Sequence, residues 1–303
     1  MKTRLLKKLY HLFPFPLAGD AVVSGAETLS ISCIIPTFQR DADLEVLLHC
    51  LSGQDLCKEE FEVIVVEDGE GEKTGQLIRQ FSSQLNLVHL TNPAPLNNVA
   101  RLRNQGLNYS KGELILFLDD DTIIPQEYFL ERIVKLFAGD ISVGAVQIPG
   151  EASYGLWRIK YDYLDRYSFA TRCVAYRRTV LAKIGGFSEG LASYEDIEMA
   201  IRFTIKDGRM TRADDLLYRH PPLYFDSWDK PLCNGLSFLR LFGHYSKPVW
   251  FVCYINALRF FPCLLLPNIK YRQWGKISVG FFWAPFYSAF QKVAHTNKKI
   301  IYR

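Results

Sequence analysis

The chain has 303 residues, 49% of them hydrophobic and 22% charged, so it can bury a core in one or two domains and is not disordered throughout. Its seven cysteines lack C-x-x-C spacing, which indicates buried thiols in a reducing compartment and neither a disulfide framework nor a zinc site. The net charge of +4 is unevenly distributed: residues 230–303 carry eleven Lys or Arg and no acid, whereas the rest holds 25 basic and all 32 acidic side chains.

The first 27 residues are predicted to form a basic amphipathic segment followed by a linker. Four basic residues alternate with leucines and phenylalanines, but no continuous apolar stretch leads to a small-residue cleavage site, so a secretion signal is not predicted. Proline and glycine recur over residues 14–28, as is typical of a linker. The basic residues are Lys2, Arg4, Lys7 and Lys8.

From residue 28 onward, short apolar runs alternate with segments that have apolar residues at helical spacing. The predicted strands are Ser30–Pro36, Phe61–Glu67, Leu85–Leu90, Glu113–Leu118 and Ser142–Ile148. The predicted helices are Asp43–Leu51 with Asp41 as N-cap, Lys73–Phe81, Val99–Tyr109, and one that Pro125 opens and that runs through Phe137. This alternation predicts an α/β fold whose mainly parallel sheet is covered by helices on both faces.

Acidic residues follow two of the predicted strands. Glu67 and Asp68 end the second strand, and Asp119–Asp121 directly follows Glu113–Leu118. Ligands of such sheets bind at the carboxyl ends of the strands, so both clusters are expected on one rim. Adjacent carboxylates repel by about 1 kcal/mol per pair even in water, and their oxygens suit Mn2+ or Mg2+. We therefore expect a divalent ion that binds a diphosphate; a polar turn at a strand end is the alternative.

Five segments, taken together and in order, resemble a family 2 glycosyltransferase with the GT-A fold, from Ile31 to about His220. One such motif alone would be weak, whereas five in register are specific. The resemblance implies a GT-A catalytic domain over residues 28–229. The segments are SISCIIPTFQR (Ser30–Arg40), VIVVEDG (Val63–Gly69), ARLRNQGLNYSKGELILFLDDDT (Ala100–Thr122), CVAYRRTVLAKIGGFSEGLASYEDIEMAIRF (Cys173–Phe203) and YRH (Tyr218–His220).

The resemblance also implies roles for individual residues. Asp196 is the expected general base and Glu195 the second choice, although acids that begin a helix also serve its dipole. Asp119, Asp121 and His220 are expected to bind Mn2+ or Mg2+; a structural histidine is the alternative for the last. Glu67 is expected to bind the donor, and a turn and helix cap is its alternative role. Arg101 is interpreted as a solvated surface charge. The expected nucleotide-sugar ligands are Pro36, Thr37, Arg40, Glu67, Asp68, Arg103, Asn104, Asp119 and Asp120.

The implied reaction is inverting, metal-dependent transfer of one sugar from a nucleotide-diphosphate sugar to a glycan or lipid-linked acceptor. A nucleotidyltransferase, the first alternative, would need a glycine-rich phosphate loop near the first strand, and PTFQR is not one. A non-catalytic assembly protein, the second alternative, need not keep three aspartates together with Asp196 and His220. Processive synthases of the family carry Gln-x-x-Arg-Trp, whereas this chain has Arg272-Gln273-Trp274, so we expect a single addition.

Residues 230–303 are predicted to form a helical membrane-association region. Sixteen of the 42 aromatic residues fall between Phe238 and Phe290, in blocks that suit an anionic membrane surface and not nucleic acid. Val249–Pro267 is 19 residues long but contains Asn256, Arg259 and Pro262, so helices lying in the interface are favoured over a span. An apolar subdomain packed on the core is the competing interpretation. The expected location is cytoplasmic, peripheral on the inner face of the cell membrane.

Overall fold

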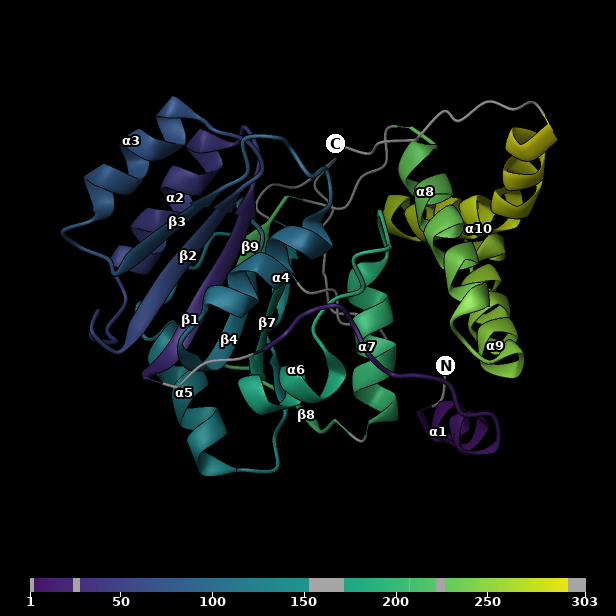
Figure 1. Cartoon of the computed structure of the whole chain (residues 1–303), viewed down its shortest axis with the longest axis horizontal. Helices are drawn as coiled ribbons and strands as arrows, with labels where there is room; N and C mark the ends of the chain where they lie inside the picture. The colour runs from purple at the N-terminus through teal and green to yellow at the C-terminus, as the bar shows by residue number, and fades with distance from the viewer. Residues whose placement is uncertain (1–2, 24–27, 153–171, 207, 222–226, 294–303) are drawn as a thin grey trace. The chain divides into compact units, whose positions relative to one another are not determined.

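A computed structural model of the protein describes residues 3–23, 28–152, 172–206, 208–221 and 227–293 (Figure 1). It divides into two compact units. The sheet unit comprises residues 18–188 and 196–222, and the helical unit comprises residues 1–17, 189–195 and 223–303. The N-terminal segment thus groups with the C-terminal helices.

The sheet unit contains a seven-stranded sheet with the order β3-β2-β1-β4-β7-β5-β8. The first four strands in this order run parallel, and β7 runs antiparallel to both of its neighbours. The predicted mainly parallel sheet is therefore confirmed, whereas the sequence pattern predicted no strand at β7. The strands are β1 (Leu29–Thr37), β2 (Phe61–Glu67), β3 (Leu87–Thr91), β4 (Gly112–Leu118), β5 (Ala145–Gln147), β7 (Cys173–Arg177) and β8 (Met210–Arg212).

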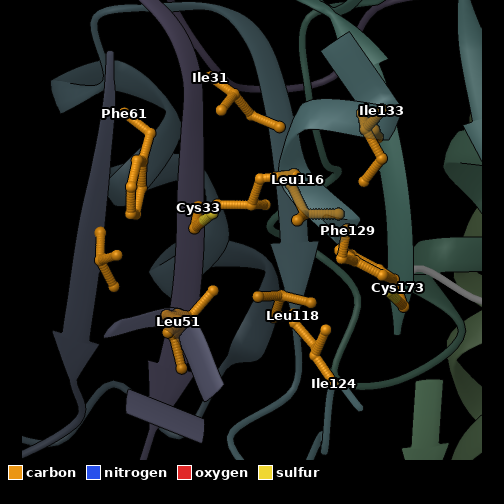
Figure 2. Packing of buried hydrophobic residues seen from close by; sticks show 14 of the residues in the cluster. Ile31, Cys33, Leu51, Phe61, Leu116, Leu118, Ile124, Phe129, Ile133 and Cys173 are labelled. Carbon is orange, nitrogen blue, oxygen red and sulfur yellow. The ribbon is translucent and has the colours of Figure 1, made fainter. Parts of the chain in front are cut away.

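Helices cover both faces of this sheet, because successive strand residues point to opposite sides. Ile31 and Cys33 of β1 pack on one side with α2 (Asp41–Ser52), α3 (Glu72–Phe81) and α5 (Phe129–Gly139) (Figure 2). Ile34 and Phe117 pack on the other side. The helices of that second side are α4 (Val99–Tyr109), α6 (Arg178–Ile184) and α7 (Glu195–Ile205).

Two predicted helix starts are wrong, and contacts from distant parts of the chain explain both. The helix expected from Pro125 begins at Phe129, where the side chain of Gln54 accepts the Leu130 N–H at 3.0 Å and donates to the Gln126 carbonyl at 2.9 Å. Asp41 is not an N-cap: α2 begins at Asp41 itself, and its carboxylate accepts a hydrogen bond from Thr74 at 2.9 Å.

Part of the segment predicted as a linker is bonded to the sheet unit. The N–H groups of Gly19, Asp20 and Ala21 donate to carbonyls of residues 184, 187 and 185 at 2.8, 3.0 and 2.9 Å. Those carbonyls belong to the turn that follows α6, where Gly185 and Gly186 have positive φ angles of 71° and 60°. This stretch of chain therefore has a fixed conformation.

The helical unit contains α1 (Thr3–Leu12), α8 (Asp229–Arg240), α9 (Lys247–Leu258) and α10 (Ile269–Val293), with short 3-10 turns η2 (Leu241–Gly243) and η3 (Phe261–Leu265). Among the described residues, one segment, Lys247–Leu265, is long and apolar enough to cross a membrane by length and composition alone. It comprises α9 and η3, so its regular α-helix ends at Leu258.

Candidate active site

The carboxyl ends of three neighbouring strands form the rim on which the site is built. β1 ends at Thr37 and β2 ends at Glu67, and these two residues are partners in the parallel register. β4 ends at Leu118, so Asp119 is the first residue beyond it. The Thr37 hydroxyl donates to Oδ2 of Asp120 at 2.9 Å, which joins the ends of β1 and β4.

His220 reaches this rim through strand pairing. It ends β9 (Tyr218–His220), which pairs in parallel with β6 (Gly150–Ala152). On the other side, Ile123 and Arg219 form an antiparallel bridge with two N–H···O bonds of 2.8 Å. Because His220 follows Arg219 and Asp121 stands two residues before Ile123, this bridge holds His220 beside the aspartates.

Asp119, Asp121 and His220 come together as a candidate metal site. His220 Nε2 lies 2.8 Å from Oδ1 of Asp121 and 3.5 Å from Oδ2 of Asp119, and one ligand atom from each residue lies within 4.8 Å of the others. Two carboxylates and one imidazole are a donor set that Mn2+ accepts, and the carboxylates also suit Mg2+. The residues present therefore fit a divalent cation.

Arginines surround the three aspartates. Arg103 Nη2 lies 2.9 Å from Asp119, and Arg40 Nη1 lies 2.7 Å from Asp121 and 3.4 Å from Asp120. Arg172, whose Nε is 4.0 Å from Asp119, was not predicted, because it belongs to no motif and is brought close only by the start of β7. The rim thus offers guanidinium groups of the kind that bind diphosphates.

The three neighbouring carboxyl groups differ in acidity. Burial raises the pKa of Asp119, but the hydrogen bond with His220 and the charge of Arg103 outweigh this effect and hold it well below the usual range. Burial likewise opposes ionisation of Asp121, yet contact with His220 keeps its pKa lowered. For Asp120, burial dominates over the favourable charge of Arg40 and raises the pKa to about 7. Among these three carboxyl groups, Asp119 and Asp121 therefore favour the ionised form, whereas burial favours the protonated form of Asp120.

Glu67 and Asp68 stand on the same rim but are held by local contacts. Glu67 accepts hydrogen bonds from the Gly71 N–H at 2.9 Å and the Thr74 hydroxyl at 2.7 Å, and its other oxygen lies 2.9 Å from His89 Nε2. Asp68 accepts the N–H groups of residues 96 and 97 at 2.5 and 2.8 Å. These contacts favour the turn-and-cap role for Glu67 and make Asp68 the anchor of the loop before α4.

The other residues predicted to bind the nucleotide sugar differ in how accessible their side chains are. Arg103 faces Asp119 and also stacks over the ring of Phe187, with 5.4 Å between the guanidinium carbon and the ring centroid. The buried Asn104 instead binds both main-chain groups of Phe187, at 2.9 and 3.0 Å, which favours a structural role. Pro36 is buried inside β1. Arg101, which is not among the predicted ligands, is exposed on α4.

The predicted base stands in the first turn of α7, as expected. The N–H of Ile197 donates a hydrogen bond to Oδ1 of Asp196 at 2.7 Å. Glu195 is buried, with 7% of its surface exposed. Sequence reasoning missed the ion pair one turn further on, between Glu198 and Arg202 at 2.6 Å, although its i,i+4 spacing was visible. Arg202 also donates to the Ile184 and Gly186 carbonyls, so the pair ties α7 to the turn that holds Phe187.

Comparison with known proteins decides the family. Residues 32–194, more than half of the chain, match the family described as Glycosyl transferase family 2. The chain is a member of this family. It is 27% identical to the glycosyltransferase AglE of Haloferax volcanii over 203 residues, which are 63% of this chain and 66% of AglE. It is 33% identical to the poly(ribitol-phosphate) beta-N-acetylglucosaminyltransferase TarS of Staphylococcus aureus over 200 residues, 63% of this chain and 35% of TarS. The chain thus spans less than two thirds of the length of either relative.

Solved structures of other transferases share the fold of this family 2 member. The mannosyltransferase PcManGT from Pyrobaculum calidifontis, in complex with GDP-Man and Mn2+, matches with a TM-score of 0.61 at 18% identity, over 96% of each chain. Residues 1–349 of S. aureus TarS, in complex with UDP-GlcNAc, match with a TM-score of 0.55 at 18% identity, over 89% of this chain and 93% of that one. These likenesses confirm the predicted GT-A fold.

Proposed function

We propose that this family 2 glycosyltransferase moves a single sugar from a nucleotide-diphosphate sugar to an acceptor hydroxyl, with inversion and with a bound divalent metal. The observation that carries the proposal is the cluster of Asp119, Asp121 and His220 at the carboxyl end of β4, flanked by arginines. Carboxylates, an imidazole and guanidinium groups at one strand end are suited to a metal-bound diphosphate.

The proposed donor class agrees with the names of the similar proteins. TarS has been solved with UDP-GlcNAc, and PcManGT with GDP-Man and Mn2+. In the present chain, Asp119, Asp121 and His220 would hold the Mn2+ or Mg2+ ion. When bound, such an ion stabilises the negative charge that develops on the departing diphosphate. Arg40, which directly precedes α2, and Arg103 of α4 would bind diphosphate oxygens.

The acceptor step is assigned to Asp196. Its carboxylate takes the proton of the acceptor hydroxyl while that oxygen attacks the anomeric carbon on the face opposite the diphosphate. A carbon–oxygen bond to the acceptor forms and the bond to the diphosphate breaks. A single displacement of this kind inverts the anomeric configuration. The electron pair of the broken bond stays on the diphosphate oxygen, so the nucleoside diphosphate leaves as an anion, whose charge Arg40 and Arg103 would offset.

The proposed acceptor is a glycan or a lipid-linked glycan, used at an anionic membrane surface on the cytoplasmic face of the cell membrane. The support is the concentration of basic and aromatic residues in residues 230–303. Attachment of the enzyme to that surface would keep it near an acceptor that is confined to two dimensions.

Calorimetric titration tests the donor and metal assignments together. Wild-type protein is titrated with UDP- and GDP-linked sugars, with and without Mn2+, beside Asp121→Ala and the exposed-residue control Arg101→Ala. We expect one donor to bind at least about tenfold more weakly without Mn2+, and Asp121→Ala to lose this dependence while Arg101→Ala keeps it. If wild-type protein binds every sugar nucleotide equally with and without Mn2+, the metal-dependent proposal fails. Proton NMR of the product then reads the anomeric configuration.

A further inference from the structure

Helix α10 has an unusual distribution of side chains between its two faces. Its buried face carries mainly small or polar residues: Gln273, Gly275, Ser278, Gly280 and Ala284, with Phe281 the one large exception. Its exposed face carries Phe282, Trp283, Phe286 and Phe290, with exposed fractions of 42%, 55%, 56% and 67%. These four residues lie within one arc of the helix, because they are spaced by one, three and four positions. A helix that packs in water buries its large apolar residues instead.

The small residues on the buried face allow α10 to approach α8 very closely. A Cβ atom at Gly280 would lie 2.0 Å from the Pro231 carbonyl oxygen, and one at Gly235 would lie 2.5 Å from the Gly280 carbonyl oxygen. Close contact through small residues, with large apolar residues facing outward, is the arrangement found where the outer face of a helix contacts lipid. We propose that the exposed aromatic side chains of α10, together with η3, contact the acyl and headgroup region of an anionic bilayer.

The lipid-facing surface continues from α10 onto η3. The rings of Phe261 and Phe282 are 5.7 Å apart, which joins the two elements, and Leu265 is 89% exposed. Leu266, directly after η3, is 42% exposed. Large, exposed apolar side chains of α10 and η3 therefore lie next to one another. We define this surface as the aromatic face: Phe261, Leu265, Leu266, Phe282, Trp283, Phe286 and Phe290.

The charges around the aromatic face match an anionic partner. No Asp or Glu occurs between Lys230 and Arg303, whereas eleven Lys or Arg do. Several cations lie over aromatic rings, as expected where side chains extend from apolar surface toward lipid phosphates. Lys247 lies 3.3 Å from the Phe242 ring centroid, and Arg259 lies 4.5 Å from that of Phe260. A second copy of the chain would bring like charges together, so a lipid surface is favoured over self-association.

The lengths of the helices favour insertion into the interface over a complete span. The uncharged part of α10, Ile277–Gln291, has 15 residues and so covers about 23 Å, whereas the hydrocarbon core is about 30 Å thick. The α-helical part of Lys247–Leu265 has 12 residues and is followed by Arg259. Both segments are therefore expected to lie along the membrane surface. This inference deepens the proposed function, because it rests on a membrane-bound acceptor and names the surface that reaches the membrane.

Flotation with vesicles tests the aromatic face directly. Full-length protein is mixed with vesicles of phosphatidylcholine alone or of equimolar phosphatidylcholine and phosphatidylglycerol, without donor or metal. We expect the wild type to float with the anionic vesicles, and the triple variant Trp283→Ala, Phe286→Ala, Phe290→Ala to partition about a hundredfold less. The matched control is Val46→Ala, Tyr128→Ala, Ile141→Ala, which removes three exposed apolar side chains from the sheet unit and should float normally.

Several outcomes would overturn the inference. Wild-type protein that does not float, or a triple variant that floats as well as wild type, removes the aromatic face as the lipid contact. A wild-type dimer that the same three substitutions dissociate, without flotation, would assign the face to a second copy of the chain. A second variant, Trp283→Phe, keeps an apolar side chain at this position and is therefore expected to fold normally. If Trp283 contacts lipid, brominated lipid should quench the tryptophan fluorescence of the wild type more than that of this variant. Asp121→Ala should float normally, so failure of the proposed chemistry is distinguishable.

Discussion

The two units of this protein place their large side chains in opposite ways. In the sheet unit the largest fully buried side chains include Tyr176, Phe117 and Arg202, and charged groups are paired at the strand ends. The helical unit has a small aromatic core of its own, with Phe238 and Phe281 5.3 Å apart. Yet α10 buries Gly280 against α8 and exposes Phe282, Trp283, Phe286 and Phe290. The first pattern is suited to water on the outside and the second to lipid.

The comparison also separates two kinds of charge. At the strand ends of the sheet unit, Asp119 and Asp121 lie opposite specific cations that fix their position and acidity. Residues 230–303 contain no acidic residue, and two of their cations, Lys247 and Arg259, lie against aromatic rings. Charges of the first kind are suited to precise chemistry, whereas charges of the second kind suit an extended anionic surface. The following changes are chosen to break or sharpen this contrast.

The largest effect is expected from the acid assigned to catalysis within the sheet unit. Asp196→Asn removes a base without changing shape, so kcat should fall by about a thousandfold, while donor affinity stays within a factor of about two. Single-turnover transfer and donor titration measure the two quantities. Glu195→Gln, one residue earlier in α7, is the matched control and should keep most of the activity. Near-native turnover by Asp196→Asn would show that another group takes the proton.

A nearby acid of the same helix should affect stability. Glu198→Gln leaves the guanidinium of Arg202 buried without its carboxylate, which is expected to cost about 3–5 kcal/mol in the free energy of unfolding. Urea denaturation measures this loss. Lys135→Ala breaks the Glu131–Lys135 pair, which has the same i,i+4 spacing but is exposed, and should cost less than about 0.5 kcal/mol. Equal losses from both changes would contradict a stabilising role for the buried Glu198–Arg202 ion pair.

In the helical unit, the corresponding structural test is the small-residue contact of α10. Gly280→Ala places a methyl group against the Pro231 main chain, so about 1–3 kcal/mol of stability should be lost through overpacking. Hydrogen exchange of α8 and α10 should then accelerate, while β1 and β4 of the sheet unit remain protected. Gly243→Ala is the control, because no atom lies within 4 Å of its added Cβ. Unchanged exchange in Gly280→Ala would mean that the helices do not need this close approach.

Local sequence patterns predicted the elements better than their capping. The strand Phe61–Glu67 and the helix Val99–Tyr109 are confirmed residue for residue, because apolar periodicity reflects burial on one face. Asp41 was wrong as an N-cap, since its carboxylate binds Thr74 of another helix. No pattern within the segment around residue 41 could reveal that partner.

The same distinction holds for the site. Asp119, Asp121 and His220 were predicted from motifs, and the bridge between Ile123 and Arg219 brings them together. Arg172 was missed because its proximity to the site depends on the antiparallel β7, which interrupts the predicted βαβ order. Residue types and their order could thus be read in advance, whereas contacts made by antiparallel or distant segments could not.

The smallest predicted effect concerns a contact of this long-range kind. Gln54→Ala removes the side chain that accepts the Leu130 N–H and donates to the Gln126 carbonyl, so it should destabilise the start of α5 by about 1 kcal/mol. Thermal unfolding compared with Gln76→Ala, whose exposed amide lies 3.3 Å from Glu72, measures the difference. If both changes have the same small effect, water replaces the hydrogen bonds of the Gln54 side chain. The late start of α5 must then come from Pro125, because the residue before a proline is biased away from helical conformation.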